Sequence, residues 1–208
     1  MNQIFIHHLF FYGLHSMDPQ SYKKTLLDTL YAPYVHCVAC PLGTLGRNSV
    51  VFGEGNPDAR LMFIGEGPGA DEDMQNRPFI GRSGRLLTAT LEKFNISRKE
   101  VYITNIVKCR PPNNRKPTEQ ESTICKNILL LNQIKIIRPT VICTLGSSAL
   151  AGLLQKEVKI TQMRGIPIPA KTLVIFPTYH PAYILRNARE LNTFCDDIDT
   201  AIKLAYKK

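Results

Sequence analysis

Short runs of apolar, mostly β-branched residues alternate along the chain with longer stretches in which apolar residues recur every three or four positions. The short runs predict buried strands at residues 61–64, 101–104, 140–145 and 173–176. The longer stretches predict helices at residues 20–30, 84–94, 118–137, 147–155 and 190–206. This alternation predicts a three-layer α/β/α fold, in which helices cover both faces of a mostly parallel central sheet of about four strands.

Size and composition agree with one globular domain. The 208 residues are 44% hydrophobic and 21% charged, which excludes disordered and fibrous proteins. No run of about 18 uncharged apolar residues occurs, so we expect no membrane span. We expect a single domain over residues 17–208. Residues 1–16 lack the basic start and cleavage site of a signal peptide, and we expect them to be an extension that is disordered or precedes the native start.

Polar residues follow three of the predicted strands, at the edge where parallel sheets bind ligands. Glu66 follows the first strand, Asn105 follows the second, and His180 follows the last, just before Pro181. An amide can present both a donor and an acceptor to a polar ring. Each residue also has a simpler interpretation, a turn-forming Asn or a structural His. The expected position of all three residues at one edge of the sheet favours a functional site.

The glycines around Glu66 loosely match a nucleotide-binding pattern. Gly65, Gly67 and Ala70 fit G-x-G-x-x-A, but that pattern must open a helix at once so that backbone amides face a pyrophosphate. We expect Pro68, an acidic stretch and Pro78 to delay the helix. A nucleotide cofactor is therefore disfavoured.

The chain is strongly basic, with 26 Lys and Arg against 17 Asp and Glu, a formal net charge of +9 and a pI near 9.3. This balance favours a polyanionic partner. Four basic residues lie in the proline-stiffened loop after the second strand: Lys108, Arg110, Arg115 and Lys116. The loop suits phosphate groups, and an ordinary solvated basic loop is the alternative.

The six cysteines divide into two groups, and without a secretory signal we interpret them as thiols or metal ligands. Four could close a zinc site or an iron–sulfur cluster: Cys37, Cys40, Cys109 and Cys125. The Cys37–Cys40 pair alone would also suit a redox dithiol. Cys143 and Cys195 are typical of small buried apolar residues.

Several separated motifs occur together, in an order and spacing that is similar to one known family. They are Cys37-x-x-Cys40 followed by Pro-Leu, Gly65-Glu-Gly-Pro-Gly69 with Glu72-Asp73, Arg77-Pro-Phe-Ile-Gly81 with Gly84, Thr104-Asn-Ile-Val-Lys-Cys-Arg-Pro-Pro112, and His180-Pro-Ala-Tyr183 with Arg186. Over residues 22–206 the sequence resembles the family 4 uracil-DNA glycosylases, the iron–sulfur type.

The resemblance implies a 4Fe-4S cluster held by Cys37, Cys40, Cys109 and Cys125. It also implies a uracil pocket, in which Phe79 stacks on the flipped base, Asn105 reads its polar edge and His180 bonds its 2-oxygen. Glu66 would lie beside the sugar and the attacking water, and either stabilise the cationic sugar or orient that water. Gly67 would line the pocket, where family members commonly carry Ala.

The implied function is excision of uracil from DNA by hydrolysis of the N-glycosidic bond, which leaves an abasic site for base excision repair. The expected partner is uracil-containing DNA, single- or double-stranded, contacted by Arg110, Arg115 and Arg186. Ile184 or Leu185 would wedge into the vacated stack. We expect a monomer in the cytoplasm, associated with the nucleoid while on DNA.

Two other classes of function stay open on sequence alone. One is a DNA-binding iron–sulfur or zinc protein without catalysis, and the other is a nucleotide-dependent oxidoreductase. A related branch that traps its product covalently carries a His-containing insertion after the second strand. The loop here contains no His, so we expect ordinary turnover.

Overall fold

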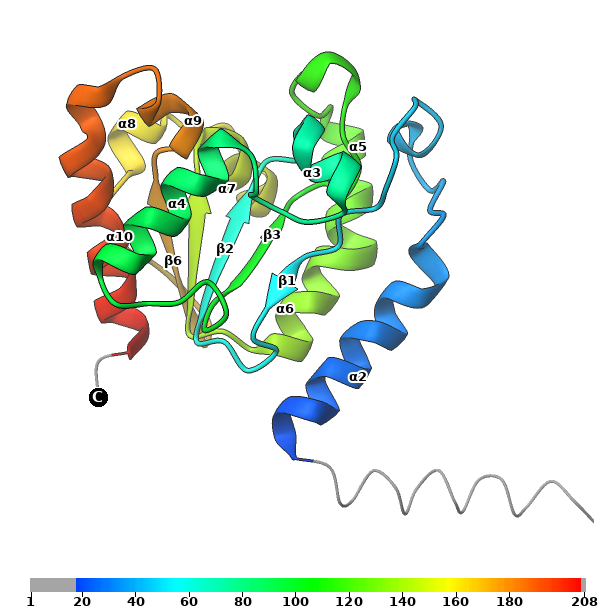
Figure 1. Ribbon diagram of the computed structural model, residues 1–208, viewed down its shortest axis with the longest axis horizontal. Coiled ribbons are helices and arrows are strands. Elements are labelled where there is room, and N and C mark those ends of the chain that lie inside the picture. The colour runs from blue at the N-terminus through cyan, green and yellow to red at the C-terminus, as the bar shows by residue number, and fades with distance from the viewer. Residues whose placement is uncertain (1–17, 207–208) are drawn as a thin grey trace, which may run out of the picture.

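The computed structural model describes residues 18–206, and the extension predicted over residues 1–16 lies outside them. The described residues form a six-stranded sheet in the order β1-β3-β2-β4-β6-β5. The strands are β1 (Glu54–Gly55), β2 (Leu61–Gly65), β3 (Tyr102–Asn105), β4 (Val141–Leu145), β5 (Ile168–Ala170) and β6 (Leu173–Thr178). The four inner strands are parallel. This confirms the mostly parallel sheet of the prediction (Figure 1).

The two outer strands, β1 and β5, are absent from the sequence prediction. Both run antiparallel to their neighbours and pair over only two or three residues, too few for a periodic pattern to show. Strand β6 also continues through Pro177, past its predicted end at Phe176. A proline has no amide to donate to a ladder, and it fits here because β5 pairs only as far as Ile175.

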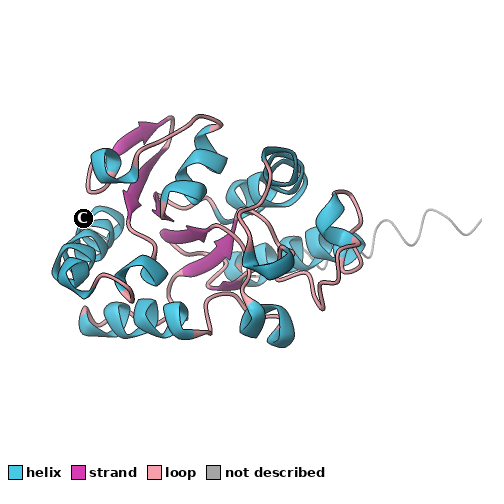
Figure 2. Ribbon diagram, turned by 90° about the horizontal axis from the view of Figure 1, so that it is seen from above, coloured by secondary structure: helices cyan, strands magenta, loops and turns pink. Residues whose placement is uncertain are grey.

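Helices cover both faces of the sheet, which confirms the three-layer architecture (Figures 1 and 2). On one face lie α4 (Arg82–Lys93) and α10 (Leu191–Tyr206), and on the other lie α5 (Glu119–Cys125), α6 (Leu131–Ile137) and α7 (Ser147–Leu154), with α2 (Pro19–Tyr31) packed outside α6. Shorter turns connect them: α3 (Ala70–Gln75), α8 (Ile160–Met163), α9 (Pro181–Ile184), and single turns at Ala32–Tyr34, Pro41–Gly43, Pro112–Asn114 and Ala188–Glu190. Among residues 18–206, no helix combines the length and apolarity needed to cross a bilayer.

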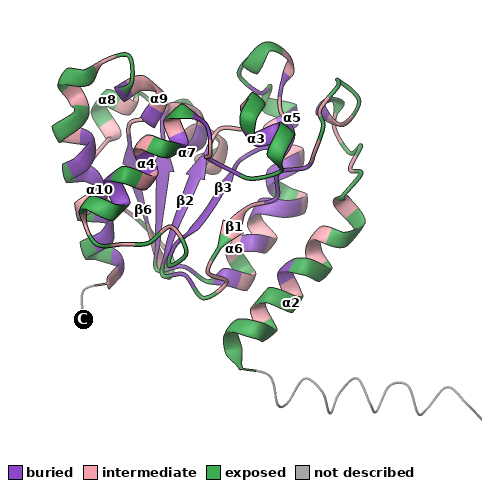
Figure 3. Ribbon diagram, in the orientation of Figure 1, coloured by how far each residue is buried: buried purple, intermediate pink, exposed green. Residues whose placement is uncertain are grey.

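Strand β2 supplies side chains to two separate hydrophobic cores. Leu61 and Phe63 pack on the α4 and α10 side, whereas Met62 and Ile64 pack on the α6 and α7 side. All four are fully buried, and Figure 3 shows β2, β3 and β4 buried along their length. Burial on both faces explains why this strand is a continuous apolar run.

The helix predicted over residues 118–137 is interrupted. It begins with a capping box, in which the Glu121 amide donates to Thr118 Oγ1 at 3.2 Å and the Thr118 amide donates to Glu121 Oε2 at 2.8 Å. A π-helical segment, Lys126–Leu130, then separates α5 from α6. The extra residue per turn in a π-helix shifts the register of the helix face directly after Cys125.

The predicted delay before the first helix after β2 is wrong. The acidic stretch itself forms α3, which begins at Ala70. The Gly69 amide at its start donates to Glu72 Oε2 at 3.1 Å, so the helix is capped by its own carboxylate. Asp73 is also buried and accepts hydrogen bonds from the amides of Asn48 and Ser49. The carboxylates of Glu72 and Asp73 thus hold loop backbone in place by accepting its amide hydrogen bonds, and they do not belong to a solvent-exposed turn.

Candidate active site

A cavity of about 630 Å³ opens beyond the carboxyl ends of the parallel strands. Strands β2 and β4 are neighbours in the sheet, and the chain leaves them in opposite directions, from β2 toward β3 at one edge and from β4 toward β6 at the other. The connections therefore diverge between β2 and β4, and this divergence leaves the crevice in which such sheets bind ligands. Seven of the predicted site residues line this cavity: Glu66, Gly67, Phe79, Asn105, Arg115, His180 and Arg186.

Asn105 ends β3 with its side chain buried at the cavity. It is only 1% exposed, and among the described residues nothing donates a hydrogen bond to its Oδ1. A Cβ on the adjacent Gly65 would lie 2.5 Å from that oxygen, so glycine is required beside it. A buried acceptor without a donor costs about 1–3 kcal/mol. The amide oxygen is therefore set to accept from a ligand.

Lys108 does not belong to the phosphate-facing edge to which the sequence assigned it. Its side chain is 0% exposed, and its ammonium donates to the Asn105 carbonyl at 2.8 Å and to Thr104 Oγ1. Burial lowers the pKa of Lys108 to about 7. The residue braces the backbone behind Asn105 and is not available to a phosphate.

His180 caps the short helix α9 and faces the cavity from the end of β6. Its Nδ1 accepts from the Ala182 amide at 3.1 Å. Burial, with a smaller effect of Arg186, lowers the pKa of His180 to about 4. The imidazole is therefore neutral at pH 7, and because Nδ1 is an acceptor, Nε2 carries the proton. The ring presents an N–H donor without a positive charge.

Phe79 enters the cavity from the loop between α3 and α4. Its φ is +52°, a left-handed conformation that costs a non-glycine residue about 1–2 kcal/mol. The ring centroid lies 5.8 Å from that of His180. A Cβ on Gly65 would lie 2.7 Å from Phe79 Cε2, and a Cβ on Gly84 would overlap the Phe79 backbone carbonyl. Two glycines thus leave room for this ring and its unusual backbone.

Glu66 and Gly67 form the wall of the cavity next to β2. Glu66 also lines an adjoining cavity of about 540 Å³ between α5 and α7. A Cβ on Gly67 would lie 2.8 Å from Val107 Cγ2, so an alanine here would require Val107 to move. Glu72 lines the main cavity too, but its carboxylate accepts from the amides of Gly69, Ile80 and Gly81. Of the two acidic residues that line the main cavity, Glu66 is therefore the one available to take part in a reaction.

The three arginines predicted to contact DNA differ in their surroundings. Arg186 is exposed on the cavity rim after α9. Arg115 also reaches the cavity, but its guanidinium forms a two-pronged ion pair with the buried carboxylate of Glu121, at 2.8 and 2.9 Å. Arg110 lies outside the cavity lining and donates to Asn114 Oδ1 at 2.8 Å. Arg186 is thus the freest of the three beside the cavity.

The four cysteines proposed as ligands come from three segments of the chain: Cys37 and Cys40 follow α2, Cys109 follows β3, and Cys125 ends α5. All pack at the same core and none forms a disulfide. Burial raises the pKa of Cys109 to about 12 and that of Cys125 to about 11, and the other thiolates of the set add to both shifts. The Lys108 amide donates to Cys125 Sγ at 3.3 Å.

This donor set has the chemistry of a metal-cluster site. Thiolates that repel one another need a cationic centre to be stable as ligands, and amide donors to sulfur are typical of iron–sulfur sites. Within residues 18–206, no three Cys, His, Asp or Glu side chains are arranged to hold a single metal ion. Cys143 lies in the core on the opposite face of the sheet, and Cys195 is buried on α10.

Sequence reasoning assigned no role to two tyrosines of the cavity wall. Tyr179 and Tyr183 line the cavity with ring centroids 4.9 Å apart. The Arg164 guanidinium lies 5.7 Å from the Tyr179 centroid and forms an ion pair with the buried Asp197. Both tyrosines lie close to His180 in the sequence, and this proximity could have indicated that they line the same site.

A family model, described as the uracil DNA glycosylase superfamily, matches residues 52–203. The chain belongs to this superfamily. It is 48% identical over 190 residues to the type-4 uracil-DNA glycosylase of Thermotoga maritima, a match that covers 89% of this chain and 98% of the relative. This finding confirms the resemblance inferred from the motifs.

Two further relatives extend the comparison within the superfamily. The type-4 uracil-DNA glycosylase of Sulfurisphaera tokodaii is 42% identical over 170 residues, with 77% of this chain and 76% of the relative covered. The type-5 uracil-DNA glycosylase of Thermus thermophilus is 30% identical over 162 residues, with 66% and 73% covered. Identity is thus higher to these type-4 members than to this type-5 member.

The neutral, partly buried imidazole of His180 predicts that this residue makes stability sensitive to acid. The folded protein holds the pKa of His180 near 4, whereas the unfolded chain protonates it near the ordinary value of about 6.5. The His180 contribution to stability is therefore constant above pH 6.5 and is lost as the pH falls from about 6.5 to 4. Urea unfolding at several pH values should show His180→Gln losing less stability than wild type across this window.

His36→Gln serves as the matched control, because it removes an exposed imidazole and should leave the slope of stability against pH as in the wild type. Parallel curves for wild type and His180→Gln would contradict the assignment of a neutral His180.

Proposed function

We propose that this chain is a uracil-DNA glycosylase of the type-4 class, which flips uracil out of DNA, hydrolyses its N-glycosidic bond and leaves an abasic site. Membership of the superfamily and the named relatives support the proposal. The single observation that carries it is the buried Oδ1 of Asn105, to which nothing in the described part of the chain donates a hydrogen bond, and which faces a cavity shared with a neutral His180 and the ring of Phe79. With DNA as the substrate, we propose a location in the cytoplasm, with the enzyme associated with the nucleoid while on DNA.

The polar groups of the cavity match the edge of uracil. Uracil carries an N–H at ring position 3, which can donate to Asn105 Oδ1, and a 2-oxygen, which can accept from His180 Nε2–H. Cytosine has a bare ring nitrogen at position 3, so it would set an acceptor against an acceptor. Phe79 supplies an aromatic face, and stacking contributes about 1–3 kcal/mol per base. A base must leave the duplex to reach such a pocket.

The reaction separates charge, and the site is built to stabilise both signs. The C1′–N1 bond breaks with its electron pair on uracil, so negative charge develops on the base and positive charge on the sugar. His180 donates to the 2-oxygen as it becomes anionic, and its neutral form keeps a second cation away from the sugar. Water then adds its hydroxyl to C1′ and its proton is released. Glu66, the carboxylate left unengaged, stabilises the sugar cation or orients this water.

The rim of the cavity supports a grip on DNA. The net charge of +9 favours the phosphate backbone, and Arg186 stands exposed beside the cavity. Of the two wedge candidates, Ile184 is 2% exposed and packs in the core, whereas Leu185 is 43% exposed. We therefore assign the wedge that fills the vacated base stack to Leu185.

We propose that Cys37, Cys40, Cys109 and Cys125 hold a 4Fe-4S cluster. Two observations support the fit. Four free thiols lie at one core and would repel one another as thiolates, and the Lys108 amide donates a hydrogen bond to Cys125 Sγ. When bound, the cluster supplies a structural cross-link among three chain segments. The residues at the cavity carry out base recognition and hydrolysis.

The first test measures excision by variants of the base-reading residues. Wild type should convert uracil-containing single- and double-stranded oligonucleotides to alkali-labile products. Asn105→Ala and His180→Ala should each lower the single-turnover rate by about 10²–10³-fold, because each removes one hydrogen bond to the base. Both should keep the visible absorbance of the wild type. Lesion-independent DNA binding with no base release by the wild type would contradict the proposal and favour a non-catalytic DNA-binding protein.

The wedge predicts a difference between substrates. Leu185→Ala should slow excision from duplex DNA by about 10-fold, since the vacated stack then closes more readily, while excision from single strands changes less than 2-fold. Leu191→Ala is the control, because Leu191 is similarly exposed and lies outside the cavity lining. Equal losses on both substrates would reject the wedge.

The cluster assignment predicts the metal content of two matched cysteine variants. Wild-type protein purified without oxygen should contain iron and acid-labile sulfide in equal amounts. Cys125→Ala should lose most of both, whereas Cys195→Ala, which removes another buried thiol, should retain them. Stoichiometric zinc without iron in the wild type would refute the 4Fe-4S assignment.

A further inference from the structure

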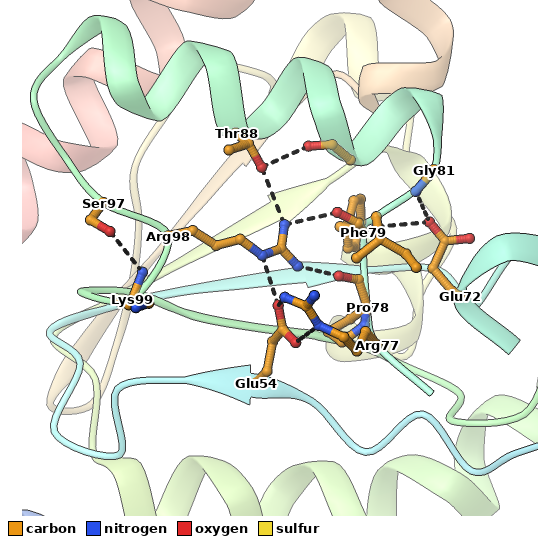
Figure 4. A network of polar contacts seen from close by, with 12 residues as sticks. Glu54, Glu72, Arg77, Pro78, Phe79, Gly81, Thr88, Ser97, Arg98 and Lys99 are labelled. Carbon is orange, nitrogen blue, oxygen red and sulfur yellow. Dashed lines mark hydrogen bonds and ion pairs between the residues drawn. The ribbon is translucent and has the colours of Figure 1, made fainter. Parts of the chain in front are cut away.

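The backbone of the Phe79 loop is held by a guanidinium that lies outside the cavity. Arg98, in the connection between α4 and β3, donates from Nη1 to the Phe79 carbonyl at 2.8 Å and from Nη2 to the Pro78 carbonyl. Nη1 also donates to Thr88 Oγ1 on α4 at 3.3 Å. Figure 4 shows the guanidinium directed at these two successive carbonyls. One side chain thereby fixes the peptide planes on both sides of the left-handed residue.

The amides that follow Phe79 are held from the opposite side. Those of Ile80 and Gly81 donate to Glu72 Oε1 at 3.1 and 2.9 Å. The loop is therefore clamped, with its carbonyls on Arg98 and its amides on Glu72. A left-handed residue outside glycine persists only where its surroundings over-determine it. This clamp meets that requirement at Phe79.

Glu54 orients the guanidinium of Arg98. Arg98 Nε donates to Glu54 Oε1 at 2.8 Å, which directs Nη1 and Nη2 toward the loop. Burial tends to raise the pKa of Glu54, but hydrogen bonds from Arg77 and Arg98 outweigh it and lower the pKa below its ordinary value. The Arg98 side chain is 15% exposed, and neither Arg98 nor Glu54 lines the cavity. The pair acts at a distance from any bound base.

We propose that Arg98, oriented by Glu54, is a positioning residue that sets the Phe79 ring for stacking on the flipped uracil. The inference rests on the proposed function, because it takes Phe79 as the stacking group. Lysine cannot replace Arg98, since a single ammonium lacks the planar fork that spans two carbonyls. A ring displaced by about 1 Å can lower a rate by about 10²-fold, which sets the scale of the expected effect.

A matched pair of variants separates this role from the loss of an ion pair. Arg77 bonds the same Glu54 at 2.8 and 3.1 Å, is exposed, and contacts neither carbonyl. Arg98→Met and Arg98→Lys should lower kcat/KM on uracil DNA by 10- to 100-fold and weaken inhibition by free uracil by a similar factor. Arg77→Met should change both by less than 2-fold. Melting temperatures identify any variant that fails to fold, and Arg98→Lys keeps a cation beside Glu54.

The decisive measurement is made in a background without the ring. If Arg98 acts through Phe79, Arg98→Met should cost less than about 3-fold in kcat/KM when added to Phe79→Ala. A full 10- to 100-fold loss in that background would overturn the inference, as would unchanged inhibition by free uracil in both Arg98 variants. Phe79→Ala by itself tests the proposed function. If that variant excises and binds uracil like the wild type, the stacking assignment fails, whatever Arg98 does.

Discussion

The divergence of the chain at the carboxyl ends of β2 and β4 is the constraint on which the site depends. Parallel strands bring their ends to one edge, and helices on opposite faces leave that edge uncovered where the connections part. Residues that follow four different strands then meet at one cavity. Asn105 and His180 lie 75 positions apart in the sequence, and neither could reach the other without this topology.

The site holds several features that cost stability, and groups outside it offset that cost. Within residues 18–206 the buried Asn105 amide oxygen has no donor, Phe79 is left-handed, and the His180 imidazole is neutral in a partly buried position. Lys108 braces the Asn105 backbone, and charged side chains clamp the Phe79 loop. Strain of this kind is common where a protein prepares to bind a ligand. These charged side chains therefore hold the backbone of the site in place and contribute little to the charge of the protein surface.

Much of the fold was accessible from the sequence, because the inner strands are largely buried on both faces and are therefore rich in consecutive apolar residues. The capping box at Thr118 is also visible in the sequence, because its two residues lie three positions apart. The edge strands were not accessible, since two or three paired residues carry no period. Lys108 was misassigned because a basic residue near prolines and arginines looks solvated, and only packing against β3 and α5 buries it. Arg98 carried no signal, because its partners lie 10 to 44 positions away.

The amino-acid sequence by itself determined the strand and helix alternation, the family and the identity of the chemical groups, since periodicity and motif spacing are local properties. The tertiary structure alone decided which of those groups are free to act. It buried Lys108, paired Arg115 with Glu121, and exposed Leu185 rather than Ile184. It also left the Asn105 oxygen without a donor among residues 18–206. The physical reason is that burial and hydrogen-bond partnership depend on neighbours brought together by folding, which no local pattern encodes.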